Sequence, residues 1–78
     1  MADRFFACER GVVDLTKVLA IEAPVPFSQR RDPLLKGFVI RLEGEQGLYW
    51  QWAVPDNEQL VDQVYDDITT AWMEYLLD

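Results

Sequence analysis

A helical pattern of apolar residues occupies the C-terminal third of the chain. From residue 60 onward, apolar side chains stand at positions 60, 61, 64, 65, 68, 71, 72, 75 and 76. At 100° per residue these positions fall within an arc of about 160°, as on a helix that covers a sheet with one face. Asp56 is placed as a helix N-cap, and Gln59 three residues later completes a capping box. The pattern predicts an amphipathic helix over about residues 57–77.

Before the helix, residues 37–54 alternate between apolar and other side chains with a period of two. One face of the pattern is apolar throughout: Phe38, Ile40, Leu42, Leu48, Trp50, Trp52 and Val54. Two glycines within residues 43–47 allow the chain to turn between the two runs, and Pro55 ends the second run. This arrangement is typical of a β-hairpin with one buried face. Val39 and Tyr49 fall on its other face, near each other across the hairpin.

The N-terminal part of the chain has a second extended pattern. Residues 4–8 form a short, mostly apolar run, and residues 9–11 are typical of a turn in which Gly11 can take a positive φ. Residues 12–22 are again extended in character and rich in β-branched side chains. The stretch at residues 15–21 also fits two helical turns, but we favour strand.

Residues 23–36 join the two extended segments and contain three of the four prolines of the chain. Proline removes a backbone donor, so we expect a long loop without regular pairing here. The segment also carries the adjacent pair Arg30 and Arg31. Two interpretations stay open: a solvated crossover between two hairpins, or a binding loop that uses the arginines.

Together these elements predict the α+β class in the order β-β-β-β-α. We expect a small antiparallel sheet of about four strands, or five, within residues 4–22 and 37–54, with the long C-terminal helix packed on one face. Residues 1–78 should form a single domain. A chain of 78 residues buries only about 60% of the surface that its unfolded form exposes. Since disulfides and zinc ligands are lacking, a partner or self-association is expected to add stability.

Charge is distributed unevenly along the chain. All seven basic residues lie at or before Arg41, whereas nine of the fourteen acids follow it, so the two parts carry +2 and −9. The net charge of −7 opposes direct binding to nucleic acid or to an anionic membrane, because phosphates attract cations. The single cysteine suits a reducing compartment. No apolar stretch resembles a signal peptide or reaches the roughly 18 residues of a membrane helix, so we expect a cytoplasmic protein.

The sequence offers little for catalysis. It contains no histidine, and Ser28 is the only serine, so the usual pairs of nucleophile and general base are missing. Cys8 follows an apolar run, which favours a small core residue over a reactive thiol. The neighbouring carboxylates at positions 43 and 45, and at 66 and 67, lack the geometry of a catalytic dyad or a calcium loop. We therefore expect no enzyme activity, no cofactor and no metal site.

Two surfaces are candidates for protein binding. Val39 and Tyr49 lie on the hairpin face that does not carry the core, and aromatic residues are enriched at interfaces. Glu58, Asp62 and Asp66 recur every four residues, so their carboxylates rise about 6 Å apart along one face of the helix. Such an acidic face can bind a basic partner, although solvation alone also explains it.

These features predict a non-enzymatic protein-interaction module or accessory subunit, which binds a protein partner or itself through the aromatic sheet surface and the acidic helix face. The alternative is an acidic inhibitor that occupies a basic or nucleic-acid-binding site on a target. In composition, the chain resembles bacteriophage-encoded inhibitors of host proteins. The order of the strand at residues 12–18, the aromatic hairpin and the terminal helix resembles the closing part of small bacterial pleckstrin-homology-like domains. The chain has too few strands for that barrel.

Overall fold

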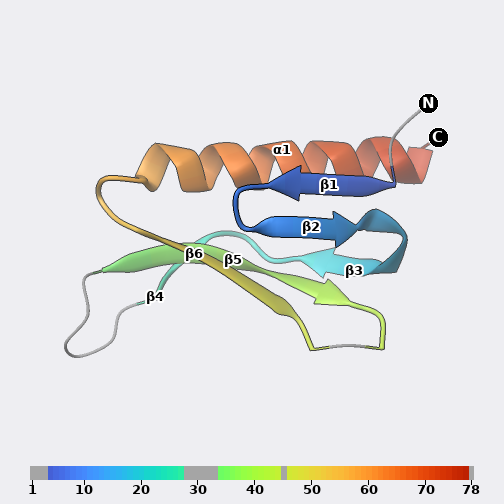
Figure 1. Cartoon of the computed structure of the whole chain (residues 1–78), viewed down its shortest axis with the longest axis horizontal. Coiled ribbons are helices and arrows are strands. Elements are labelled where there is room, and N and C mark those ends of the chain that lie inside the picture. Colours follow the sequence, from blue (N-terminus) through green and yellow to red (C-terminus); the bar gives the residue numbers. More distant parts are fainter. Residues whose placement is uncertain (1–3, 28–33, 45, 78) are drawn as a thin grey trace.

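Six strands and one long helix form over the residues that this computed structural model describes, 4–27, 34–44 and 46–77 (Figure 1). The strands are β1 (Phe5–Cys8), β2 (Gly11–Asp14), β3 (Val18–Ile21), β4 (Val25–Phe27), β5 (Leu35–Leu42) and β6 (Leu48–Ala53). The helix is α1 (Glu58–Leu77), and a 3-10 turn over Leu15–Lys17 separates β2 from β3. The predicted α+β class, with an antiparallel sheet and one C-terminal helix, is confirmed.

The strands are arranged in two antiparallel sheets. β1 and β2 form a two-stranded hairpin, while β5 lies at the centre of a four-stranded sheet. On one side β5 pairs with β6, and Val39 stands opposite Tyr49. On its other side β5 pairs with β3 at one end and with β4 at the other. β5 therefore holds the sheet together, because each of the other three strands is hydrogen-bonded to it.

Helix α1 and the β1–β2 hairpin lie on the same side of the four-stranded sheet (Figure 1). The buried core lies between these layers and takes residues from both sheets and from the helix: Val13, Leu15, Val18, Phe38, Ile40, Trp50, Trp52, Val61, Val64 and Ile68. Burial of these apolar side chains is the main favourable contribution to folding. In the described part of the chain, the other face of the sheet has no helix or strand packed over it.

An aromatic cluster occupies the middle of the core. Phe38 is fully buried, and its ring centroid lies 6.1 Å from Trp50, 6.1 Å from Trp52 and 5.4 Å from Tyr65. The contacts with Trp50 and Tyr65 are edge-to-face, a geometry that aromatic pairs favour. Phe5 is not part of this core, because its side chain is 53% exposed. Phe5 lies on the outer face of β1, since its neighbour Phe6 points inward.

The extended segment predicted at residues 12–22 is not one strand. It bends at the 3-10 turn, where the carboxylate of Asp14 accepts hydrogen bonds from the Thr16 backbone N–H at 3.0 Å and from its hydroxyl at 2.6 Å. These bonds offer the backbone an alternative to the sheet ladder. The turn buries Leu15 in the core, so the helical interpretation of this stretch was partly correct. Gly11 takes a positive φ of 142°, as predicted.

The predicted loop at residues 23–36 also contains regular structure. Val25–Phe27 forms β4, and β5 begins at Leu35 instead of Gly37, so the expectation that this segment is unpaired was wrong. Val25 pairs with Gly37 and Phe27 with Leu35. The proline between them is tolerated because its missing N–H points away from β5, as in an edge strand. Arg30 and Arg31 lie outside the described residues.

Helix α1 begins one residue later than the capping pattern predicts. The carbonyl of Asn57 accepts the first helical hydrogen bond, from the Val61 N–H at 3.0 Å, so Asn57 and not Asp56 is the N-cap. The Asn57 side chain also donates to the Ala53 carbonyl at 3.0 Å. This bond ties the start of the helix to the end of β6. The Val54–Pro55 peptide in this connection is cis.

Gly37 is required by the close approach of β5 and β6. A Cβ at this position would strike the Trp50 carbonyl oxygen and lie 2.8 Å from the Gln51 Cα. Both are backbone atoms, which cannot yield as a flexible side chain can. We therefore expect Gly37→Ala to lower the free energy of unfolding by about 1–3 kcal/mol or more, measured by urea denaturation. Gln51→Ala, across the strand pair, is the control and should change it by less than about 0.5 kcal/mol.

The change of the melting temperature with pH should reveal how much the Asp14 carboxylate stabilises the turn. The hydrogen bond from the Thr16 hydroxyl is the largest effect that lowers the pKa of Asp14 below its ordinary value of 3.8, with further lowering by the Thr16 N–H and by Arg4 and an opposing effect of burial. A carboxylate with a lowered pKa stabilises the fold above pH 3.8 and loses this contribution as the pH falls through its folded pKa. The melting temperature should therefore fall less on acidification in Asp14→Asn than in the wild type. If the melting temperature fell equally with pH in Asp14→Asn and in the wild type, this prediction would be contradicted. Asp56→Asn is the control and should behave as the wild type does.

Candidate protein-binding surfaces

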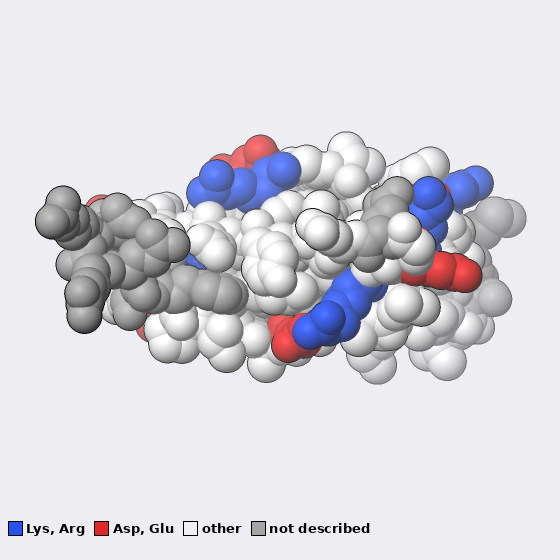
Figure 2. Space-filling model, turned by 90° about the horizontal axis from the view of Figure 1, so that it is seen from below, with Lys and Arg blue, Asp and Glu red and all other residues white. Residues whose placement is uncertain are grey.

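The uncovered face of the four-stranded sheet is mostly apolar. Alternation along β5 and β6 directs every second side chain away from the helix, and we call the resulting surface the outer face: Val25, Leu35, Val39, Arg41, Tyr49, Gln51 and Ala53. Figure 2 shows the molecule from this side, where much of the described surface is uncharged. Its charged group Arg41 is paired with Glu22, at 2.6 Å between Nε and Oε2. The outer face is therefore apolar and close to electrically neutral.

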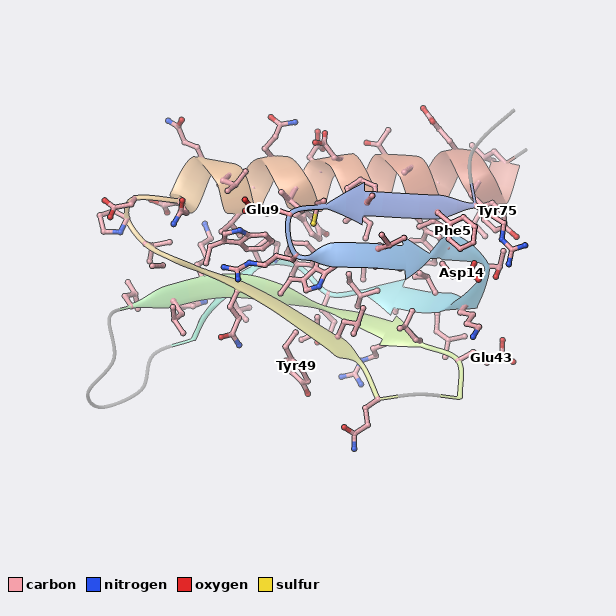
Figure 3. The ribbon with its side chains drawn as sticks, in the orientation of Figure 1. Phe5, Glu9, Asp14, Glu43, Tyr49 and Tyr75 are labelled. Carbon is pink, nitrogen blue, oxygen red and sulfur yellow. The ribbon has the colours of Figure 1, made fainter. Side chains whose placement is uncertain are left out.

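Tyr49 is the most prominent side chain of the outer face. It is 65% exposed and points away from α1 and the core (Figure 3). Val39 is its direct cross-strand neighbour, so the two residues that the sequence analysis singled out lie in contact positions on one surface. Trp50 and Trp52, on either side of Gln51, point the opposite way and are buried. A rigid strand thus presents an exposed aromatic ring, which is a common form of interface anchor.

The acidic face of α1 has a basic neighbour that the sequence analysis did not expect. Glu58 and Asp62 are exposed, with side-chain exposures of 57% and 60%, but both lie near the ammonium group of Lys36. The Nζ atom of Lys36 is 3.5 Å from Glu58 Oε1 and 3.3 Å from Asp62 Oδ1. Asp66, one turn further on, is exposed as well. Two of the three predicted carboxylates are therefore partly neutralised within the molecule.

Sequence reasoning missed this cation because Lys36 was assigned to the loop. Once β5 is seen to begin at Leu35, position 36 falls on the same face as Phe38 and Ile40, which is the face that the helix covers. The alternation that identified the core residues could therefore have found Lys36, had the strand been extended by two residues. In this chain, the basic residue at the end of the row of core-facing side chains lies beside the acids of the helix that covers the row.

The electrostatics of this pair follow from its position between sheet and helix. Burial by itself lowers the pKa of Lys36, but the hydrogen bonds and charges of Asp62 and Glu58 raise it by more, so the pKa lies above its ordinary value of 10.5. The ammonium group is therefore fully charged at neutral pH. By linkage, its stabilising contribution is present below pH 10.5 and is lost as the pH rises through the folded pKa.

The other groups that could react or bind a ligand do not lie together at one site. Cys8 is half-buried beside the core, where its sulfur accepts a weak hydrogen bond from the Arg10 N–H at 3.4 Å. A hollow of about 250 Å³ lies between β2 and the end of the β5–β6 hairpin, lined by Val12, Val13, Asp14, Lys17, Leu42 and Leu48. Over residues 4–27, 34–44 and 46–77, no three His, Cys, Asp or Glu residues are clustered to hold a metal ion.

Comparison with known proteins adds no assignment. No protein-family model, curated protein or solved structure matches the chain. In the described part of the chain, α1 is too polar to cross a membrane. The geometry of the candidate surfaces is therefore the only evidence for their role.

The effect of salt on the melting temperature should reveal the ion pairs between Lys36 and the helix. Lys36→Met keeps most of the aliphatic stem but removes the charge, so we expect a lower melting temperature at low salt. The difference from the wild type should shrink at high salt, because screening weakens exposed ion pairs. Lys36→Arg, which keeps the charge, is the control. A deficit in Lys36→Met that stays constant at every salt concentration would assign the role of Lys36 to packing instead.

Proposed function

We propose that this protein is a non-enzymatic protein-interaction module that binds its partner through the outer face. The observation that carries the proposal is the exposed ring of Tyr49 on an apolar strand pair, with Val39 beside it. Apolar surface that stays in contact with water is unfavourable, and a partner that covers it gains the free energy of its burial. The outer face offers this gain without burying an unpaired charge, because Arg41 already has Glu22 as its counterion.

The position of the outer face on a rigid sheet supports the proposal. Tyr49 belongs to a strand that is hydrogen-bonded along its length to β5, and β5 is fixed by the aromatic cluster on its other side. A side chain held by such a scaffold loses little conformational entropy on binding. We infer that the sheet presents Tyr49 and Val39 as a preformed contact, around which the remaining outer-face residues exclude water.

The second proposal is an acidic inhibitor, in which α1 occupies a basic or nucleic-acid-binding site on a target protein. Its support is that the solvent side of α1 carries acids and the helix itself has no lysine or arginine. Complementary potential would then steer the encounter. Lys36 reduces the charge of this surface at Glu58 and Asp62, which is why we place the outer face first.

The two proposals predict different effects of salt on partner binding, and they place the residues needed for binding on different surfaces. We expect tagged protein to retain a partner from a lysate of its source organism at low and at high salt, with the partner identified by mass spectrometry. The double substitution Tyr49→Thr and Val39→Thr keeps strand-forming residues but removes the aromatic anchor. It should weaken binding at least about tenfold, measured by calorimetry with the purified partner.

The control is Met73→Gln, which removes an exposed apolar side chain from α1 and should leave the affinity unchanged. Equal affinity of the double variant and the wild type would refute the role of the outer face. Binding that disappears at high salt, and that Asp62→Lys with Asp66→Lys abolishes, would instead support the acidic inhibitor.

A further inference from the structure

The edges of the four-stranded sheet differ in how they are protected against pairing with another strand. Natural proteins protect edge strands with bulges, prolines or charges. β3 has an irregular register between Val18 and Ala20, as in a β-bulge. In β4, Pro26 stands opposite Lys36, at the position whose backbone groups point away from β5, so the edge lacks a donor where a further strand would need one. Both strands on this side of β5 are therefore poor templates.

β6, on the opposite edge, has none of these protections. Its sequence from Leu48 to Ala53 contains no charged residue and no proline, and its register with β5 is continuous over all six residues. Among the described residues, β6 is hydrogen-bonded to no strand except β5. A regular, uncharged edge strand of this kind is a template for strand addition.

The hydrogen-bond pattern identifies which backbone groups of β6 face outward. The Val54 N–H donates to the Leu34 carbonyl at 3.0 Å, and the pairing register continues this ladder through Trp52 and Trp50. In an antiparallel pair, alternate residues bond to the partner strand and those between them point away. The groups that point away from β5 thus belong to Tyr49, Gln51 and Ala53. The Ala53 carbonyl already accepts from Asn57, which leaves both groups of Tyr49, both groups of Gln51 and the N–H of Ala53.

We propose that β6 pairs with β6 of a second copy of this chain, antiparallel and about a twofold axis at Trp50. In this register Tyr49 stands opposite Gln51 of the second copy, and Gln51 opposite its Tyr49. Each of these two pairs exchanges two N–H to carbonyl hydrogen bonds. The outward N–H and carbonyl groups of Tyr49 and Gln51 lie symmetrically about Trp50, so a second copy satisfies these four groups. A twofold interface needs such self-complementarity.

The charge distribution is compatible with self-association at this edge. Each chain has a net charge of −7, which would oppose contact between two acidic helices. β6 carries no charge, and α1 lies on the other side of the sheet from the outer face (Figure 1). The Arg41–Glu22 ion pair leaves the outer face close to neutral. Two copies can therefore meet along β6 without bringing their acidic residues together.

This inference goes beyond the proposed function, because it uses the backbone edge of β6 and not the side chains of the outer face. Pairing of the two β6 strands joins the two sheets into one, so their outer faces form a continuous surface. Tyr49 of each copy then lies beside Gln51 of the other, next to the twofold axis. The dimer presents the partner-binding surface twice.

The first test is the mass of the protein in solution, with a variant that blocks the edge. By sedimentation equilibrium, the wild type should have twice the 9.1 kDa mass of one chain. Gln51→Pro removes an outward N–H without removing a bond to β5, and should weaken self-association at least about tenfold. Gln51→Thr keeps the N–H and is the matched control, so it should remain dimeric. Tyr49→Thr with Val39→Thr should also remain dimeric, which separates this test from that of partner binding.

The second test is amide hydrogen exchange, which needs no substitution and decides the case if Gln51→Pro does not fold. The amides of Tyr49 and Gln51 should be protected at high protein concentration and exchange faster on dilution. The amides of Trp50 and Trp52 should be protected at both concentrations, because they bond to β5. A wild type that stays at 9.1 kDa, a folded dimeric Gln51→Pro, or a dimer with unprotected Tyr49 and Gln51 amides would each overturn the proposal. Protection that appears only when another protein is added would assign the edge to that partner's strand.

Discussion

The contacts of Phe38 hold the molecule together, because they join its two layers at one ring. Phe38 lies on the central strand β5, meets Trp50 and Trp52 of β6 within the sheet, and meets Tyr65 of α1 across the core. In a chain of 78 residues the core is small, so a few large side chains supply much of its buried area. Loss of this cluster would separate the helix from the sheet as well as weaken the hairpin.

The same alternation that turns Phe38 inward determines what remains outside. Since the helix and the β1–β2 hairpin both lie over the inner face, the sheet has one covered and one uncovered side. An antiparallel sheet with water on one side usually carries polar residues there. Here Val39, Tyr49 and Val25 occupy several of those positions instead, while the helix carries five acids and no lysine or arginine. The outer face is thus more apolar than solubility alone would favour.

Local pattern was sufficient to predict the hairpin, the helix and the side on which Tyr49 lies, because each depends on the periodicity of a continuous segment. It failed where contacts between distant parts of the chain determine the structure. The proline content of residues 23–36 argued against a strand, yet β4 forms because β5 offers a partner to Val25 and Phe27. The ion pair of Lys36 with Glu58 and Asp62 joins residues more than twenty positions apart, which no window of the sequence contains. The bend at Leu15 depends on the side-chain bonds of a single residue, Asp14.

The separation of charge between the two sides of the sheet has a further physical consequence. Helix α1 carries five acids and no lysine or arginine, while the outer face is close to neutral, so the molecule has an electric dipole along the direction from α1 to the sheet (Figure 1). Near any positively charged surface, the dipole favours the orientation in which α1 faces that surface. The sheet then faces the solution. A chain adsorbed or docked by its charge would thus keep its apolar side free, with Tyr49 directed outward.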